Sequence, residues 1–314
     1  MKRFAVGIDI GGTKVAIGLV CPEGELLAQQ RIPMDRQASA EEMVARIMTT
    51  TEELLEANDL RIGDAAGIGI GAPGPLDTSR GILDCPPNLP EWHGFAVVEA
   101  MKQHVPASVP IRMENDATAA ALAEKWVGAA QNEDHFVYLT ISTGIGAGVY
   151  THGRLVTGMS GNAGDVGHIV IDPSQGTCPC GQKGCWEHVA SGTAIARQAA
   201  ALMEQPGDKP RDKPRDAREV FEAYAAGDER MTALVEQVFT YIGMGCVTLI
   251  NILDPQKIVI GGGVSQVGDP LFHSVQQYVR QYALSPKGKQ TEIVPAHLHQ
   301  GAGVIGAAAL IWVS

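Results

Sequence analysis

The stretch Gly7-Ile8-Asp9-Ile10-Gly11-Gly12-Thr13-Lys14 decides the fold. The β-rich runs 4–10 and 15–20 flank its glycines, a pattern that predicts a β-hairpin. A P-loop has Lys before Ser or Thr and opens a helix, whereas here Thr13 precedes Lys14 and a strand follows. The turn can still bind phosphate, because glycines let backbone N–H groups converge on an anion. Asp9 would then hold Mg²⁺ through water; the alternative is a plain hairpin.

The same pattern of strand, glycine turn and strand returns roughly 130 residues later. Runs 136–141 and 149–150 flank the turn Ser142-Thr143-Gly144-Ile145-Gly146-Ala147-Gly148. A third turn, Gly261-Gly262-Gly263-Val264-Ser265, follows the strand-like run 257–260 and is expected to open a helix. The repetition predicts two halves of related architecture that face one another. Three such turns favour phosphate binding over plain hairpins.

Between the two hairpins, the sequence predicts a helix over 41–57 and a buried strand that stops at Pro73-Gly74-Pro75. A second helix is expected over 117–127, with Asn115-Asp116 at its cap and Gly128 as its stop. Because a helix N-terminus favours an anion, we expect Asp116 to be ionised and able to accept a proton at pH 7. The alternative is an ordinary capping aspartate.

The composition is that of an acidic globular protein, with 24 Lys and Arg against 35 Asp and Glu in 314 residues and a net charge of −11. This charge disfavours a nucleic-acid partner, and the length suits about two domains. We find no stretch of about 20 apolar residues. Residues 1–4 run into a strand rather than a cleavable signal, so we expect a cytoplasmic protein without a membrane span. The run 208–215, rich in proline and charge, predicts a solvated loop, and the glycines that concentrate over 144–192 are interpreted as ligand contacts.

Cys178, Cys180 and Cys185 lie close together in the chain, and His168 precedes them by ten residues. Three thiolates and one imidazole satisfy a closed, tetrahedral Zn²⁺ site of the structural type. A disulfide or redox cluster is the alternative, and an intracellular protein disfavours it. The sequence therefore predicts a structural zinc loop.

These motifs stand in the order that is typical of ROK-family sugar kinases, and the chain resembles that family over nearly its whole length, most closely its bacterial glucokinases. The resemblance rests on the stretches 7–14 and 142–148, on Gly71-Ala72-Pro73-Gly74-Pro75, on Glu114-Asn115-Asp116-Ala117, and on Cys178-Pro179-Cys180-Gly181-x2-Gly184-Cys185-x-Glu187. It implies an actin-like ATPase (ribonuclease H-like) fold of two duplicated α/β domains around a cleft. It also implies ATP with Mg²⁺ as the phosphoryl donor and a hexose, above all glucose, as the acceptor.

By this resemblance, Asp116 is the catalytic base, and one nitrogen of His168 binds zinc while the other donates to a sugar hydroxyl. Most sugar kinases of the family carry Glu where this chain has Asp165, so recognition near the anomeric end of the sugar is expected to differ. The implied sugar pocket consists of Gly74, Asn88, Asn115, Asp116, Asp165, His168 and Glu187. The implied ATP and Mg²⁺ contacts are Asp9, Gly11, Gly12, Thr13, Lys14, Thr143, Gly144, Gly146, Gly261, Gly262 and Gly263.

The same analogy divides the chain into a small α/β domain, residues 1–115 plus 303–314, and a large one, residues 116–302, which carries the zinc-binding loop 168–187. The family implies a homodimer. Two alternatives stay open. One is a kinase for N-acetylglucosamine, N-acetylmannosamine or another hexose, which the departure at Asp165 supports. The other is a non-catalytic sugar sensor like the repressors of the same family; because the first strand begins so early, we expect no N-terminal helix-turn-helix module.

Overall fold

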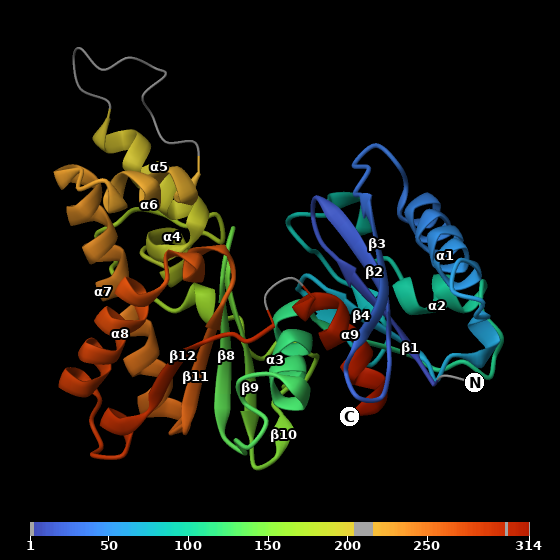
Figure 1. The fold of residues 1–314 in the computed structure, drawn as a ribbon. Helices are drawn as coiled ribbons and strands as arrows, with labels where there is room; N and C mark the ends of the chain where they lie inside the picture. The colour runs from blue at the N-terminus through green and yellow to red at the C-terminus, as the bar shows by residue number, and fades with distance from the viewer. Residues whose placement is uncertain (1–2, 204–215, 299–300, 314) are drawn as a thin grey trace.

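Two five-stranded sheets organise the chain, one in each half of the molecule (Figure 1). The computed structural model describes residues 3–203, 216–298 and 301–313, so the expected loop at 208–215 lies outside the described residues. We call the half with the N-terminal sheet the small half and the other the large half.

The sheet of the small half has the strand order β3-β2-β1-β4-β7. The first three strands are antiparallel, and the last two run parallel to β1. The first glycine turn joins β1 to β2, which confirms the predicted hairpin. A separate two-stranded sheet, β5 with β6, follows the Pro73-Gly74-Pro75 turn. The bounds are β1 Ala5–Ile10, β2 Lys14–Val20, β3 Leu26–Pro33, β4 Ile68–Ala72, β5 Leu76–Asp77, β6 Ile82–Leu83 and β7 Ile111–Asn115.

The sheet of the large half repeats this plan in the order β10-β9-β8-β11-β12. Its central strand β8 has an antiparallel hairpin on one side and two parallel strands on the other, as β1 has in the small half. The bounds are β8 Phe136–Ile141, β9 Ile145–Thr151, β10 Arg154–Leu155, β11 Lys257–Gly261 and β12 Glu292–Pro295. The predicted duplication of an α/β unit is therefore confirmed.

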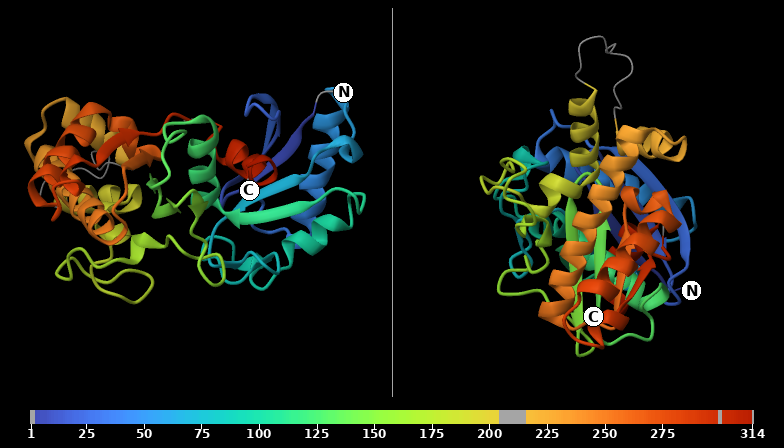
Figure 2. Two further views of the ribbon diagram at one scale, coloured as in Figure 1. Left: turned by 90° about the horizontal axis from the view of Figure 1, so that it is seen from below. Right: turned by 90° about the vertical axis from the view of Figure 1, so that its left-hand side faces the viewer.

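Helices cover the outer faces of both sheets, and two helices fill the layer between the sheets (Figure 2). α1 (Ala40–Glu56) and α2 (Val97–Lys102) pack on the small half. The inner pair is α3 (Asp116–Val127), against the large sheet, and α9 (Ala302–Trp312), against the small sheet. The outer layer of the large half consists of α4 Trp186–Ala190, α5 Gly192–Leu202, α6 Ala217–Ala225, α7 Glu229–Leu253 and α8 Asp269–Tyr282.

The two predicted helices are present with nearly the expected bounds, because their caps are local signals. Ser39 and Glu42 form a capping box at the start of α1, and Gly128 ends α3. The third glycine turn does not open an α-helix directly. It leads into a 3₁₀ turn, Gly263–Val267, and α8 begins two residues later.

Glycines allow the inner helix pair to approach its neighbours closely. A Cβ at Gly7 of β1 would lie 3.1 Å from the backbone nitrogen of Ala308 in α9, and a Cβ at Gly306 would lie 2.9 Å from that of Ala120 in α3. Gly148 of β9 faces α3 in the same way, with Thr118 Cα 3.0 Å from the Cβ position. The interpretation of the glycines as ligand contacts is therefore wrong for Gly148, where helix packing requires the missing side chain.

α7 corrects the expectation about apolar stretches. Among the described helices it is the one long and apolar enough to cross a membrane, judged by length and composition, but 61% of its apolar window is buried. Val235, Val238 and Ile242 are fully buried in the core of the large half. α7 is thus apolar because it is a core helix of the large half.

Candidate active site

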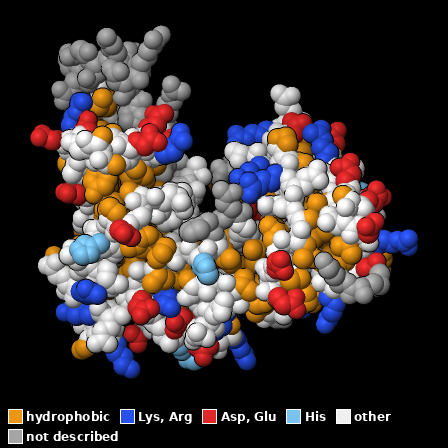
Figure 3. Space-filling view, viewed as in Figure 1, with side chains coloured by type: hydrophobic (Ala, Val, Ile, Leu, Met, Phe, Trp, Pro, Cys, Tyr) orange, Lys and Arg blue, Asp and Glu red, His pale blue; other side chains and the backbone are white. Residues whose placement is uncertain are grey.

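Three carboxylates interact where the two halves meet. Asp9 lies near the end of β1, Asp116 is the first residue of α3, and Asp165 precedes the 3₁₀ turn Val166–His168. Desolvation raises the pKa of Asp116 most, and the charges of Asp9 and Asp165 raise it further. Figure 3 shows an open notch between the two halves, with Lys and Arg side chains on one of its walls. Such a group of carboxylates favours a nearby cation.

Asn115, and not Asp116, is the capping residue of α3. Its Oδ1 accepts hydrogen bonds from the backbone N–H groups of Ala117, at 2.9 Å, and Thr118, at 3.3 Å. This leaves the Nδ2 donor of Asn115 for another partner. Asp116 Oδ1 accepts from Ala117 N–H at 2.7 Å, and the remainder of its side chain is open to solvent.

The expectation that the helix N-terminus keeps Asp116 ionised is wrong. Although the side chain is solvent-accessible, protein atoms crowd around it, and this desolvation, followed by repulsion from Asp9 and Asp165, raises its pKa to about 7. The backbone N–H group of Ala117 lowers the pKa by less than these effects raise it. A carboxyl group with this pKa is well matched to proton transfer near neutral pH.

The residues expected to bind sugar come from both halves. From the small half, Gly74 lies beside Asn115, because a Cβ at Gly74 would be 3.4 Å from Asn115 Nδ2. Asn88 is exposed and lies against the first glycine turn, with its Cβ 3.0 Å from the Cβ position of Gly12. The small half therefore brings expected sugar contacts next to an expected phosphate turn.

From the large half, Asp165, His168 and Glu187 are neighbours. Burial raises the pKa of Asp165, the charge of His168 lowers it, and the charge of Glu187 raises it. Glu187 lies in the first turn of α4, and its Oε2 accepts from the backbone N–H of Ile145 at 2.9 Å. One oxygen of Glu187 thus holds the second glycine turn, and the other is left for a ligand.

The expected phosphate turns fall into two groups. In the large half the second and third turns lie side by side, since a Cβ at Gly263 would be 3.9 Å from Ser142 Oγ. Ser142 N–H donates to Gly144 O at 2.9 Å and closes the second turn. In the small half Gly11 N–H donates to Lys14 O at 3.0 Å and closes the first turn. The remaining nucleotide candidates, Thr13, Thr143, Gly146, Gly261 and Gly262, belong to these same turns or their flanking strands.

A pocket of about 360 Å³ lies beside Asp9 and includes Lys14, Arg31 and the first residues of α9. Burial raises the pKa of Asp9, while Lys14 and Arg31 lower it by less. Sequence reasoning missed Arg31 as a residue of this pocket. The register of the strands is the signal that indicates it, because Asp9 of β1 pairs with Ala16 of β2, which pairs with Arg31 of β3. The combination of two cations, one carboxylate and a glycine turn suits a phosphate group with its metal ion.

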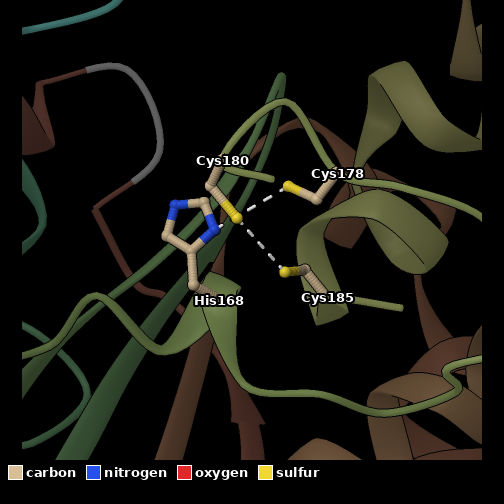
Figure 4. A group of neighbouring side chains, drawn as sticks. All are labelled: His168, Cys178, Cys180 and Cys185. Atoms are coloured by element: carbon tan, nitrogen blue, oxygen red, sulfur yellow. Dashed lines mark hydrogen bonds between the residues drawn. The ribbon is translucent and has the colours of Figure 1, made fainter. Parts of the chain in front are cut away.

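The predicted zinc ligands form one cluster (Figure 4). The ligand atoms of His168, Cys178, Cys180 and Cys185 all lie within 4.8 Å of one another. His168 Nδ1 is 3.9 Å from Cys178 Sγ, and Cys180 Sγ is 3.6 Å from Cys185 Sγ. A tetrahedral zinc site with Zn–S bonds of about 2.3 Å has edges of about 3.8 Å. The geometry therefore fits a four-coordinate ion, with the Nε2 side of the His168 ring directed away from the sulfurs.

The surroundings of the thiols shift their pKa values in opposite directions. The backbone N–H of Gln182 lowers the pKa of Cys180 to about 7, whereas burial raises the pKa of Cys185. All six cysteines are free, so the cluster contains no disulfide. Sequence reasoning missed Gln182, whose Nε2 donates to His168 O at 2.7 Å and lies 3.6 Å from Cys185 Sγ. A polar residue inside the Cys-x4-Cys segment is the signal that could have indicated it.

Comparison with known proteins gives a consistent result. The family model described as "ROK family" matches residues 5–313. A glucokinase of Thermotoga maritima is 35% identical over 318 residues, which cover 99% of this chain and 98% of that protein. An N-acetylmannosamine kinase of Haemophilus influenzae is 33% identical over 308 residues, covering 96% and 93%.

Two solved structures are similar over nearly the whole chain. A ROK family glucokinase from Streptomyces griseus in complex with glucose and AMPPNP has 31% identity and a TM-score of 0.80, with 98% of each chain covered. A ROK family transcriptional regulator, a homolog of the E. coli MLC protein, has 29% identity and a TM-score of 0.88; the match covers 99% of this chain and 78% of the regulator.

Proposed function

The chain belongs to the ROK family, and on that premise we propose that it is an ATP-dependent hexose kinase that converts glucose to glucose 6-phosphate. The observation that carries this proposal is Asp116, the first residue of α3, whose pKa is raised to about 7 by desolvation and by the charges of Asp9 and Asp165. The full-length likeness to glucokinases supports it.

In this proposal Asp116 is the base. It accepts the proton of the sugar 6-hydroxyl as that oxygen attacks the γ-phosphorus, and the bond from the γ-phosphorus to the oxygen of the departing ADP breaks. Backbone N–H groups of the glycine turns and the cations of Lys14 and Arg31 bind the phosphates. Mg²⁺, held near Asp9, would neutralise charge on the phosphate oxygens. Transfer to water is limited when the sugar excludes water from Asp116.

We propose that the sugar is held by paired donors and acceptors from both walls of the notch. Asn115 Nδ2 and the free oxygen of Glu187 are suited to this, because their other polar atoms are already bonded to backbone groups. Gly74 leaves room for the ring, Asn88 lies beside the first turn, and Asp165 binds near the anomeric end. Zinc on His168 Nδ1 would fix the ring so that Nε2 donates to a hydroxyl group.

We also propose the organisation around this site. Residues 1–115 plus 303–314 and residues 116–302 are the two domains, and they close around sugar and ATP. The protein functions in the cytoplasm as a homodimer, without a nucleic-acid or membrane partner. The net charge of −11 supports the absence of nucleic acid.

A second candidate is a kinase for an N-acylated hexosamine. Asp165 favours it, because a carboxylate one methylene shorter than Glu leaves more room beside the sugar, and an N-acetylmannosamine kinase is among the similar proteins. The two candidates differ only in the acceptor.

A kinase screen separates the candidates. ADP release is measured with glucose, mannose, fructose, allose, N-acetylglucosamine and N-acetylmannosamine at equal concentrations. We expect the highest kcat/KM with glucose. A preference for an N-acetyl sugar selects the second candidate, and sugar binding without ADP release with any of the six would identify a non-catalytic sugar sensor.

A further inference from the structure

A loop of the large half binds the backbone of the small half through one side chain. Asn162 Oδ1 accepts from Leu76 N–H at 2.9 Å, and Asn162 Nδ2 donates to Leu76 O at 2.8 Å. A third bond lies beside these two, since Thr78 N–H donates to Ser160 O at 3.3 Å. A carboxamide has the same donor and acceptor as a peptide group, so Asn162 pairs with Leu76 as a neighbouring strand would.

This contact lies at the edge of the proposed sugar pocket. Leu76 is fully buried and follows Gly74-Pro75. A Cβ at Gly74 would be 3.4 Å from both Asn115 Nδ2 and Asn162 Oδ1, so the two amides face the same space. On the large half, Asp165 comes three residues after Asn162 in the chain. Asn162 therefore connects the wall with Gly74 and Asn115 to the loop that carries Asp165.

The loop is fixed on both sides of Asn162. Before it, Gly161 has a φ of +97° and approaches Thr78 closely, which only glycine allows without strain. After it, Gly164 O accepts from Ala147 N–H of β9 at 2.9 Å. The second proton of Asn162 Nδ2 also has a partner, Ser160 Oγ at 3.0 Å. With all its polar atoms bonded, the Asn162 carboxamide has one favoured orientation.

We propose that Asn162 is a positioning residue for the sugar site: it holds the Asp165 loop of the large half in register with the Gly74–Asn115 wall of the small half. The inference rests on the proposed function of this notch, and it goes beyond the residues that would touch the sugar. The physical reason is that hydrogen bonds to hydroxyl groups tolerate little change in distance, so the two walls need a fixed separation.

The test compares wild type with Asn162→Ala and with a matched control, Asn58→Ala. Asn58 is an exposed asparagine whose Nδ2 likewise donates to a backbone oxygen, Leu54 O at 2.7 Å, and it lies just after the end of α1 in the small half. Two assays are used: KM for hexose and for ATP, and hydrogen exchange of the segment 74–80, which contains the amides of Leu76 and Thr78. We expect Asn162→Ala to raise KM for hexose about tenfold while KM for ATP stays within about twofold, since the variant loses both hydrogen bonds to Leu76 at the sugar wall and the one to Ser160 in its own loop. Exchange of segment 74–80 should accelerate about tenfold in this variant and stay unchanged in the control.

Asn162→Asp is the second variant, because it keeps the size of the side chain and the acceptor for Leu76 N–H but loses both donated bonds. It should raise KM for hexose and accelerate hydrogen exchange of segment 74–80, as the alanine variant does. It replaces the alanine variant in the test if that variant does not fold. A hexose KM within about twofold of wild type in both variants overturns the proposal, as does an equal rise of the two KM values. If wild type phosphorylates no sugar, the proposed function is wrong instead. The positioning role of Asn162 is then tested by the affinity of wild type and variants for sugar, measured by calorimetry, and by the exchange rates of segment 74–80.

Discussion

Replacing Asp116 by Asn should have two effects of opposite sign, a loss of rate and a gain of stability. The variant keeps Oδ1 for Ala117 N–H, so the start of α3 is preserved. Loss of the base should lower kcat by about 10³-fold or more. A carboxyl group whose pKa rises from 3.8 to about 7 has its ionised form destabilised by at most about 4 kcal/mol. Because the side chain is open to solvent, screening reduces this penalty, and we expect a gain of about 1 kcal/mol in the free energy of unfolding of the variant.

The gain should depend on pH in a defined way. A raised pKa destabilises the folded protein only where Asp116 would ionise, so the penalty is absent below the unfolded pKa near 3.8 and complete above about 7. The Tm of Asp116→Asn should therefore exceed that of wild type by about 2 °C at pH 8 and by much less at pH 4.5. Asp64→Asn is the control, since it removes one exposed carboxylate from the 3₁₀ turn Ile62–Asp64.

The measurements are coupled ADP release with glucose and thermal unfolding at both pH values. Residual turnover above about one tenth of wild type would refute the assignment of Asp116 as the base. A Tm gain of the same size at pH 4.5 and pH 8, or an equal gain in Asp64→Asn, would refute the argument from desolvation and repulsion.

Four further predictions follow from the same site. In wild type, kcat/KM for hexose should fall about tenfold per pH unit below pH 7, because Asp116 must be unprotonated; a profile that stays flat from pH 5.5 to 8.5 contradicts this. Asp165→Glu should shift the ratio of kcat/KM for glucose to that for N-acetylmannosamine about fivefold toward glucose, and an unchanged ratio removes Asp165 from sugar discrimination. Cys180→Ser should lower bound zinc, measured by metal analysis, and raise KM for hexose about tenfold through His168, an effect that serine at exposed Cys85 should not produce. Gly144→Ala should raise KM for hexose about tenfold, since its Cβ would lie 3.1 Å from Glu187 Cδ and displace that carboxylate; unaltered kinetics would show that Glu187 is not needed in its present place.

Local patterns in the sequence predict much of this fold. The hairpins at residues 7–14 and 142–148 follow from glycines between β-rich runs, and α3 has a cap and a stop within its own segment. The zinc cluster is similar, since three of its ligands lie within one short loop. In each case the interacting groups are close in sequence.

The features that sequence reasoning missed depend on groups that are distant in sequence. The pKa of Asp116 is set by the protein around it and by Asp9 and Asp165, which outweigh the local effect of the helix. Asn162 and Leu76 are 86 residues apart, and nothing near either residue indicates the contact. Arg31 reaches Asp9 only through the register of two strand pairs. Tertiary packing, which periodicity does not encode, decides all three.

The inner helix pair has a consequence for how the two halves move. Where α3 meets α9, the contact is between backbones and small side chains, with Ala119 and Ala120 on one helix and Gly306 on the other. Large side chains lie beside this contact, because Trp126 of α3 and Ile305 of α9 belong to one apolar cluster. At the closest approach, however, backbone atoms and small side chains meet, and these do not have to change rotamer when one helix slides on the other. We therefore expect small sliding movements of α3 on α9 to cost little energy, within the range that the hydrogen bonds between Asn162 and Leu76 permit. A bulky side chain at Gly306 should prevent this sliding.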